Sequence, residues 1–185
     1  MRISKNLRAD QENINRFLTA LGGASVILSS NKYARPKFFI SAYTFIKEYI
    51  EEGFFVKEEG LIKTLEEGGF PLDEGPIHSM RNDHKKSNEA AEHLLNAAKQ
   101  WQSGDEDARV EVGWATSLYT TAIRQHLERL KNLIFPLLEQ TITIDDEHKV
   151  SEGINGIVFE GNIKHGTEKY MKLLEELEDE LSDWR

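Results

Sequence analysis

Hydrophobic residues recur every three or four positions along most of the chain, which is the period of an amphipathic α-helix. The first such stretch runs from about Asp10, a candidate N-cap, to about Asn31. Its apolar stripe comprises Ile14, Phe17, Leu21, Ala24 and Leu28. Gly22 and Gly23 lie in the middle of this stretch, where each glycine costs roughly 1 kcal/mol relative to alanine. We therefore expect a neighbouring side chain to need the space beside them.

Three further long helices are predicted. The second begins at Pro36, which suits the first turn of a helix, and continues to about Glu67. The third spans about residues 77–101 and the fourth about 108–140. Pro136 should kink the fourth helix or end its regular part. The apolar stripe predicted for the fourth helix consists of Leu118, Ala122, His126, Leu130, Leu133 and Leu137.

The chain becomes more polar after the fourth helix. Residues 141–149 read as a connector that permits a short extended piece, and Ser151 is a candidate cap for a fifth helix over about 151–183. Its acidic end, LLEELEDELSDW, is expected to face solvent. The predicted fold is all-α: an up-down four-helix bundle with an additional C-terminal helix. We expect one domain over residues 1–185, with the core bundle over about 8–142.

Composition and charge exclude several functional classes. The net charge of −9 argues against a nucleic-acid-binding surface, because neutralising phosphates requires clustered Lys and Arg. The chain has no cysteine, which excludes disulfides, thiolate metal sites, iron–sulfur clusters and a cysteine nucleophile. No apolar run approaches membrane-spanning length, and the first residues lack the apolar core of a signal peptide. We expect a cytoplasmic protein that binds neither nucleic acid nor membranes.

Three polar side chains fall on three different apolar stripes: Glu58 on the second helix, His84 on the third and His126 on the fourth. Each lies near the middle of its helix, so an up-down bundle would bring them to similar heights. Imidazole nitrogens and carboxylate oxygens suit iron, manganese or zinc. These three residues are the predicted metal ligands. The structural alternative is that His84 and His126 are hydrogen-bonded core histidines and that Glu58 pairs with Lys57 or Arg129.

Four segments of the chain resemble parts of one known family: HLERLKNLIFP, FFVKEE, GPIHSMRNDH and FEGNIKHGTEKY, at residues 126–136, 54–59, 75–84 and 159–170. They are similar to the fourth, second, third and tail helices of hemerythrin-like, or HHE cation-binding, proteins. The resemblance implies a four-helix bundle with a di-iron site. Its ligands would be His-x-x-x-Glu pairs on the second and fourth helices and one histidine on each of the first and third.

The chain departs from this family pattern at the ligand positions. No histidine precedes His78, so the ligand of the first helix is absent, and its place falls near Gly23 or Ala24. Phe54 stands where the second helix would supply histidine, and Leu130 where the fourth would supply glutamate. The part of the implied ligand set that remains is Glu58, His84 and His126. This remaining set is expected to bind at most one ion of iron or another divalent transition metal, and it is also compatible with binding no metal.

These replacements are expected to compensate one another through packing. Phe54 and Leu130 add apolar bulk to the bundle centre, while the Gly22-Gly23 pair removes bulk from the first helix. Because protein interiors are close-packed, the Phe54 ring should lie over the glycine backbone. Tyr43 and Tyr119 are weaker candidates for an oxygen ligand.

Three functions remain open from the sequence. The first is a metal-binding domain with a reduced site, related through the resemblance to iron, oxygen or nitric oxide. The second is a metal-free bundle that serves protein interaction or oligomerisation, for example as a homodimer. The third, a ferritin-like oxidase, is the least favoured, since oxygen activation at a di-iron centre needs bridging carboxylates. We therefore favour a protein that is not an enzyme, with a metal ion or small molecule as the ligand of the bundle centre.

Overall fold

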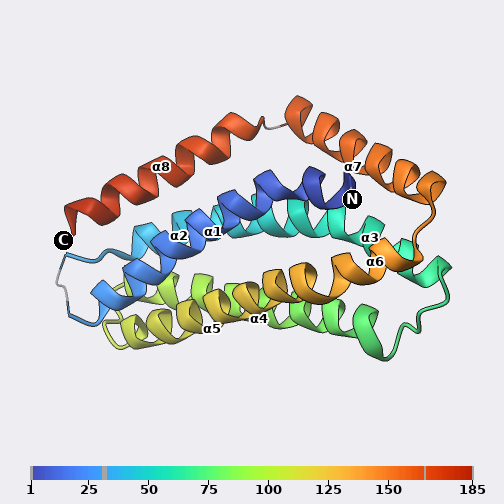
Figure 1. The fold of residues 1–185 in the computed structure, drawn as a ribbon. Coiled ribbons are helices and arrows are strands. Elements are labelled where there is room, and N and C mark those ends of the chain that lie inside the picture. The colour runs from blue at the N-terminus through green and yellow to red at the C-terminus, as the bar shows by residue number, and fades with distance from the viewer. Residues whose placement is uncertain (1, 31–32, 165, 185) are drawn as a thin grey trace.

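The computed structural model describes residues 2–30, 33–164 and 166–184, and these fold into helices joined by short turns (Figure 1). In chain order the helices are α1 (Arg2–Leu28), α2 (Pro36–Thr44), η1 (Phe45–Phe54), α3 (Phe55–Glu67), α4 (Gly75–Gln102), α5 (Ala108–Arg129), η2 (Leu130–Ile134), α6 (Phe135–Thr141), α7 (Ile144–Lys164) and α8 (Thr167–Asp183). The described residues contain no strand, which confirms the predicted all-α class. None of the helices traced here combines the length and apolarity needed to cross a membrane.

Four long helical segments form an up-down bundle. The segment α2–η1–α3 is continuous, and so is α5–η2–α6; together with α1 and α4 they alternate in direction along the bundle (Figure 1). The helix pairs α4–α5, α1–α5 and α2–α4 pack against each other. The bounds predicted for the second to fourth helices are close to those observed. The first helix instead begins at Arg2, because Ile3 and Leu7 are buried and extend its apolar stripe.

Two stretches of π-helix interrupt the second and fourth long segments. In η1 the amide of Phe55 donates to the carbonyl of Ile50, and after η2 the amide of Phe135 donates to that of Leu130. In each of these bonds the donor lies five residues after the acceptor, whereas an α-helix spaces them by four. The regular helix is therefore interrupted just before Pro136, and α-helix resumes at Phe135 with the proline in the first turn of α6. Both π-helices lie within one or two turns of the predicted ligands.

The C-terminal region differs from the single helix expected over 151–183. Helix α7 already begins at Ile144, so the cap at Ser151 is wrong. The extended backbone that the connector permits is limited to the residues just before α7, where Ile142 is extended. Ser151 lies inside α7, and its Oγ accepts a hydrogen bond of 2.7 Å from Asn6 Nδ2. Gly166, at φ +63°, separates α7 from α8 in a left-handed conformation that favours glycine. The two helices lie over the α1 and α2–η1–α3 side of the bundle (Figure 1).

The acidic C-terminal run has two faces. Most of its carboxylates face solvent, as expected, although Glu178 forms an ion pair with Arg16 of α1. Its apolar residues recur at helical spacing and are buried. The buried residues of α8 are Tyr170, Leu174, Leu177 and Leu181. The run therefore also supplies a stripe that holds α8 against the bundle.

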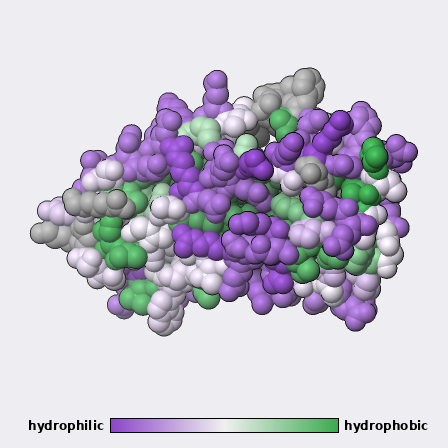
Figure 2. All heavy atoms as spheres, in the orientation of Figure 1, coloured by the Kyte–Doolittle hydropathy of each residue, from purple (hydrophilic) through white to green (hydrophobic). Residues whose placement is uncertain are grey.

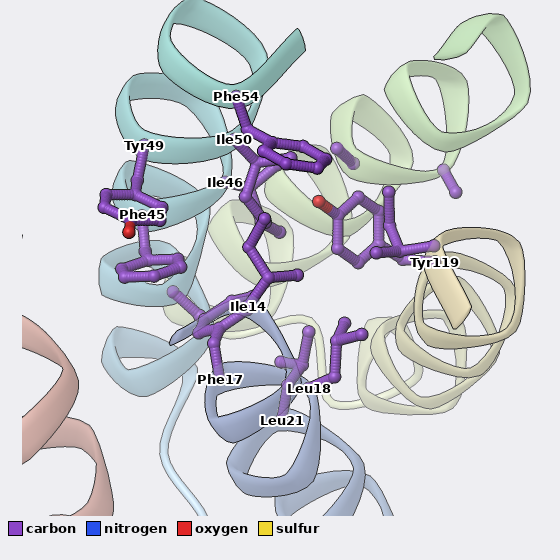
Figure 3. Close-up of a cluster of buried hydrophobic side chains, with 14 of the residues drawn as sticks. Ile14, Phe17, Leu18, Leu21, Phe45, Ile46, Tyr49, Ile50, Phe54 and Tyr119 are labelled. Carbon is purple, nitrogen blue, oxygen red and sulfur yellow. The ribbon is translucent and has the colours of Figure 1, made fainter. Parts of the chain in front are cut away.

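The apolar core runs through the centre of the bundle. Figure 3 shows Ile14 of α1, Phe54 of η1 and Tyr119 of α5 pointing into it from three helices. The stripe predicted for the fourth helix is partly wrong, because Leu118 is 60% exposed and Leu133 is 41% exposed. The residues of α5–η2–α6 that face inward are Val112, Ala115, Thr116, Tyr119, Thr120, Ile123, His126, Leu127, Leu130, Ile134, Phe135 and Leu138. Apolar residues occur on both faces of α5, so periodicity alone did not identify the buried one.

The expected packing of Phe54 over the glycine pair is also wrong. The Phe54 ring points towards Tyr119 and Ile14 (Figure 3). A Cβ atom added at Gly22 would have Arg124 Nη2 as its nearest neighbour, at 3.9 Å. The space at Gly22 therefore faces an arginine side chain of α5.

Candidate metal centre

Glu58 of α3, His84 of α4 and His126 of α5 come together in the bundle. One ligand atom from each lies within 4.8 Å of the other two. Glu58 is fully buried, His126 is 1% exposed, and the His84 side chain is 15% exposed. The predicted convergence of these side chains is confirmed, and His84 provides the edge of the cluster that is nearest to solvent.

The two imidazoles both face the Glu58 carboxylate. His126 Nε2 lies 2.8 Å from each Glu58 oxygen, and His84 Nε2 lies 2.5 Å from Glu58 Oε2. An ionised carboxylate only accepts hydrogen bonds, so each histidine donates an N–H to Glu58 in this arrangement. Glu58 is therefore the centre of the cluster.

Asp83 joins the cluster from the far side of His126. His126 Nδ1 lies 3.1 Å from Asp83 Oδ2, and Arg129 Nε donates to the same oxygen at 2.8 Å. A continuous chain of charge-assisted hydrogen bonds thus links Arg129, Asp83, His126, Glu58 and His84. Asp83 is not among the residues predicted from the sequence, although it directly precedes His84, because it does not belong to the apolar stripe of its helix.

The expected alternative partners of Glu58 bind other carboxylates. Arg129 pairs with Asp83, as described above, and Lys57 forms an ion pair with Asp10 of α1. Burial alone would raise the pKa of Glu58, but the facing His126 and His84 lower it below its ordinary value. Histidines therefore compensate its charge instead of lysine or arginine.

The surroundings of His126 favour its protonated form. Burial acts to lower the pKa of His126, but the Glu58 carboxylate and the hydrogen bond to Asp83 outweigh burial and raise it from 6.5 to about 9. Burial acts to raise the pKa of Asp83, and its hydrogen bonds to His126 and Arg129 lower it overall. Glu58, Asp83 and His126 are therefore charged and paired with one another near neutral pH.

Phe55 forms the apolar wall of the cluster. Its ring stacks on His84, with centroids 3.9 Å apart and an interplanar angle of 17°, and it meets His126 edge-on at 5.7 Å. The two imidazole rings lie 4.9 Å apart. Phe54, which the sequence analysis singled out, packs instead in the adjoining apolar layer. Phe55 therefore holds both rings in place and keeps water from one side of them.

The position assigned to the missing ligand of the first helix is wrong. Asp10 contacts Lys57, which directly precedes Glu58 in the sequence. The segment of α1 at the height of the cluster is therefore the one around Asp10. Ala24 lies fourteen residues further along α1, about 21 Å away at 1.5 Å per residue. The glycine pair therefore lies outside the site.

The remaining candidates lie apart from the cluster. Tyr43 donates a hydrogen bond to Glu92 of α4. Tyr119 is buried without a hydrogen-bond partner for its hydroxyl and lies seven residues before His126, about 10 Å along α5. His93 and His148 lie on the surface, and His165 lies outside the described residues.

The chemistry of the cluster fits one metal ion. Two imidazole nitrogens and one carboxylate form a common ligand set for divalent iron or zinc, with open positions left over. Ligands bound at about 2.0–2.2 Å from one ion lie about 3 Å or more apart, so the histidines need to retreat by less than about 1 Å. The hydrogen bond from Nδ1 to Asp83 would keep His126 Nε2 aimed at the ion. Phe54 and Leu130 provide no ligand for a second ion.

Comparison with known families gave one match. The family model described as "Hemerythrin HHE cation binding domain" matches residues 2–138. No curated protein and no solved structure matches the chain. The matched range contains the four bundle segments up to Leu138 and all residues of the cluster, while α7 and α8 lie beyond it.

Proposed function

Because this chain belongs to the hemerythrin HHE cation-binding family, we propose that it binds one divalent transition-metal ion through Glu58, His84 and His126. The observation that carries the proposal is the convergence of these three donor groups inside the bundle. Iron is the ion we propose first, since domains of this family usually bind it.

Each residue around the cluster has a distinct part in this function. Glu58 would supply the negative charge that the ion needs, and Asp83 would orient His126 through Nδ1. His84 stands nearest to solvent and marks the side from which an ion or a small molecule enters. A transition-metal ion held here would supply open coordination positions for a small ligand such as oxygen or nitric oxide. Phe55 would keep these positions dry on one side.

A reduced site of this kind favours binding over catalysis. The family resemblance implies a carboxylate at Leu130 and a histidine at Phe54, and both positions carry buried apolar side chains. Glu58 is the one carboxylate among the three proposed ligands, so a second ion would have no set of bridging carboxylates to share. We propose a single-ion site in a cytoplasmic protein, within one domain in which α7 and α8 pack on the bundle.

Metal analysis of the protein, purified without a chelating tag, tests this function. We expect one equivalent of metal per chain after anaerobic incubation with iron(II), falling to background in His126→Ala and in Glu58→Gln. His93→Ala, which removes a surface histidine, should retain the full equivalent. Two equivalents in the native protein, or equal binding by Glu58→Gln, would contradict the proposal.

A metal-free interaction module is the second candidate, because the network is fully paired by its own residues. The charges of Arg129, Asp83, His126 and Glu58 compensate one another through hydrogen bonds of 2.8–3.1 Å. Such a network can fix the arrangement of a bundle without an ion. Binding of no metal by folded native protein under the conditions above would favour this candidate.

A further inference from the structure

The outer face of α4 and α5 carries an apolar stripe that no described helix covers. Helices α7 and α8 pack on the opposite side of the bundle, over α1 and α2–η1–α3 (Figure 1). On α5, Val110, Trp114 and Leu118 follow one another at four-residue spacing and are 58%, 63% and 60% exposed. This spacing places them in one row along the helix. Figure 2 shows hydrophobic residues at the surface near the end of the bundle where α5 begins.

A groove lies beside this row. It has a volume of about 770 Å³ between α4 and α5, and several of the residues that line it are small, among them Ala90, Ser117 and Ala122. Trp114 stands at one edge of this groove and also borders a second one, of about 470 Å³, that adjoins α1. The same face thus presents a large protruding aromatic ring and a hollow lined in part by small residues.

The exposed face of α4 and α5 has an acidic end and an end that carries a lysine. The start of α5 is acidic, with Asp107 before its first residue and Glu111 in its first turn. Towards the other end, Lys86 of α4 lines the groove together with Gln125, and Glu89 lines it one turn further along α4. A two-fold rotation reverses the direction of the face and brings the acidic end of one copy to the lysine end of the other.

We propose that this face binds a second copy of the same chain in an antiparallel, two-fold symmetric dimer. With the axis near Ser117, Trp114 of each copy lies beside Leu118 of the other, and Val110 lies beside Ala122. Each Trp114 ring enters the α4–α5 groove of the other copy, and each Asp107 approaches a Lys86. Ring and groove lie on one face at matching distances from the axis, which is the self-complementarity that a two-fold interface requires.

The size of the face sets the expected affinity. From Asp107 to Gln125 it extends about 27 Å along α5, and two helices side by side are about 20 Å wide. This gives on the order of 500–600 Å² per copy, which is below the usual size of stable interfaces and in the range of weak, transient ones. We therefore expect a dissociation constant in the micromolar range, with Trp114 as the dominant contact.

Sedimentation equilibrium of the full chain between about 1 and 200 µM tests the dimer. The mass should rise from 21.2 kDa at low concentration towards twice that value. Trp114→Glu should weaken association at least about thirtyfold, as expected for a central aromatic contact. The matched control is Ile144→Glu, at an 86% exposed residue of α7, which should dimerise like the native protein. A monomer at every concentration, or unchanged association of a folded Trp114→Glu, would overturn the proposal and leave the face to another partner.

Two further variants test the orientation of the copies. Because the chain has no cysteine, Ser117→Cys introduces its sole thiol. At the 8–10 Å spacing of packed helices, a bis-maleimide reagent of about that reach should link two copies, whereas Ile144→Cys should not be linked. Lys86→Glu and Asp107→Lys should each weaken the dimer at least about fivefold, and the double variant should recover most of the loss. Cross-linking of Ile144→Cys alone, or additive losses in the double variant, would overturn this geometry.

Discussion

Replacing Asp83 by asparagine tests how the Asp83 carboxylate acts on His126 while His126 itself stays in place. The variant keeps the size of the side chain and an oxygen that accepts from His126 Nδ1, but it removes the charge that His126 and Arg129 share. In the metal-free protein the pKa of His126 rises from 6.5 to about 9, which corresponds to about 3 kcal/mol in favour of the imidazolium. Two carboxylates share this effect, so we expect Asp83→Asn to cost about 1–2 kcal/mol.

The assay has two readouts, made on the same preparations. A loss of 1–2 kcal/mol in a chain of this length lowers the melting temperature in EDTA by about 3–6 °C. Titration with iron(II) should show an affinity about 10- to 100-fold below that of the native protein, as is typical when the carboxylate behind a ligating histidine is lost. The matched control is Asp73→Asn, which removes the same charge from an exposed residue of the α3–α4 turn and should change neither value. Native affinity and native melting temperature in Asp83→Asn would refute the orienting role of Asp83.

Three other predictions follow from the cluster. Iron(II) at a hundred times its dissociation constant should stabilise the native protein by about 2.7 kcal/mol, and EDTA should reverse the gain; a melting temperature insensitive to both would favour the metal-free function. Phe54→His with Leu130→Glu should raise the iron bound per chain above one equivalent and destabilise the metal-free protein by roughly 1–3 kcal/mol for each unsatisfied group, as seen in urea unfolding. The pKa of His126 is about 9 in the folded protein and 6.5 in the unfolded chain. In EDTA, its contribution to the free energy of unfolding should therefore be complete below pH 6.5 and disappear as the pH rises through 9. His126→Gln should lose this pH dependence, whereas His93→Gln should keep it.

The site residues that could be predicted from the sequence are those in which a polar side chain occupies an apolar stripe. Glu58, His84 and His126 are polar residues on apolar stripes, and a charged group in such a place calls for partners that lie close by. Asp83 escaped this reasoning because it lies off the stripe, half-buried at the edge of the cluster. Its role depends on which way the His126 ring turns, and spacing along the chain does not carry that information.

Register between helices was the other feature that the sequence did not determine. The first helix was placed in the site at Gly23 or Ala24, whereas the ion pair of Asp10 with Lys57 shows that a segment about 21 Å away is level with Glu58. Hydrophobic periodicity describes each helix by itself and does not determine its axial register relative to the neighbouring helices. The extra length of α1, which begins at Arg2, depends likewise on α7 packing against it.

The π-helix η1 influences the direction in which Glu58 points, because it sets the rotation of α3 about its own axis. An α-helix turns 100° per residue, and a π-helix turns less, so η1 determines how far α3 is rotated relative to α2. If η1 wound as an α-helix with all its residues retained, every side chain of α3 would turn by on the order of 100° relative to α2, and Glu58 would leave the bundle centre. Deleting one residue from η1 would instead let this stretch wind as an α-helix with little change in the phase of α3, because an i→i+5 turn holds one residue more than an i→i+4 turn. The π-helix thus accommodates one extra residue of the second helical segment without turning the carboxylate away from the centre.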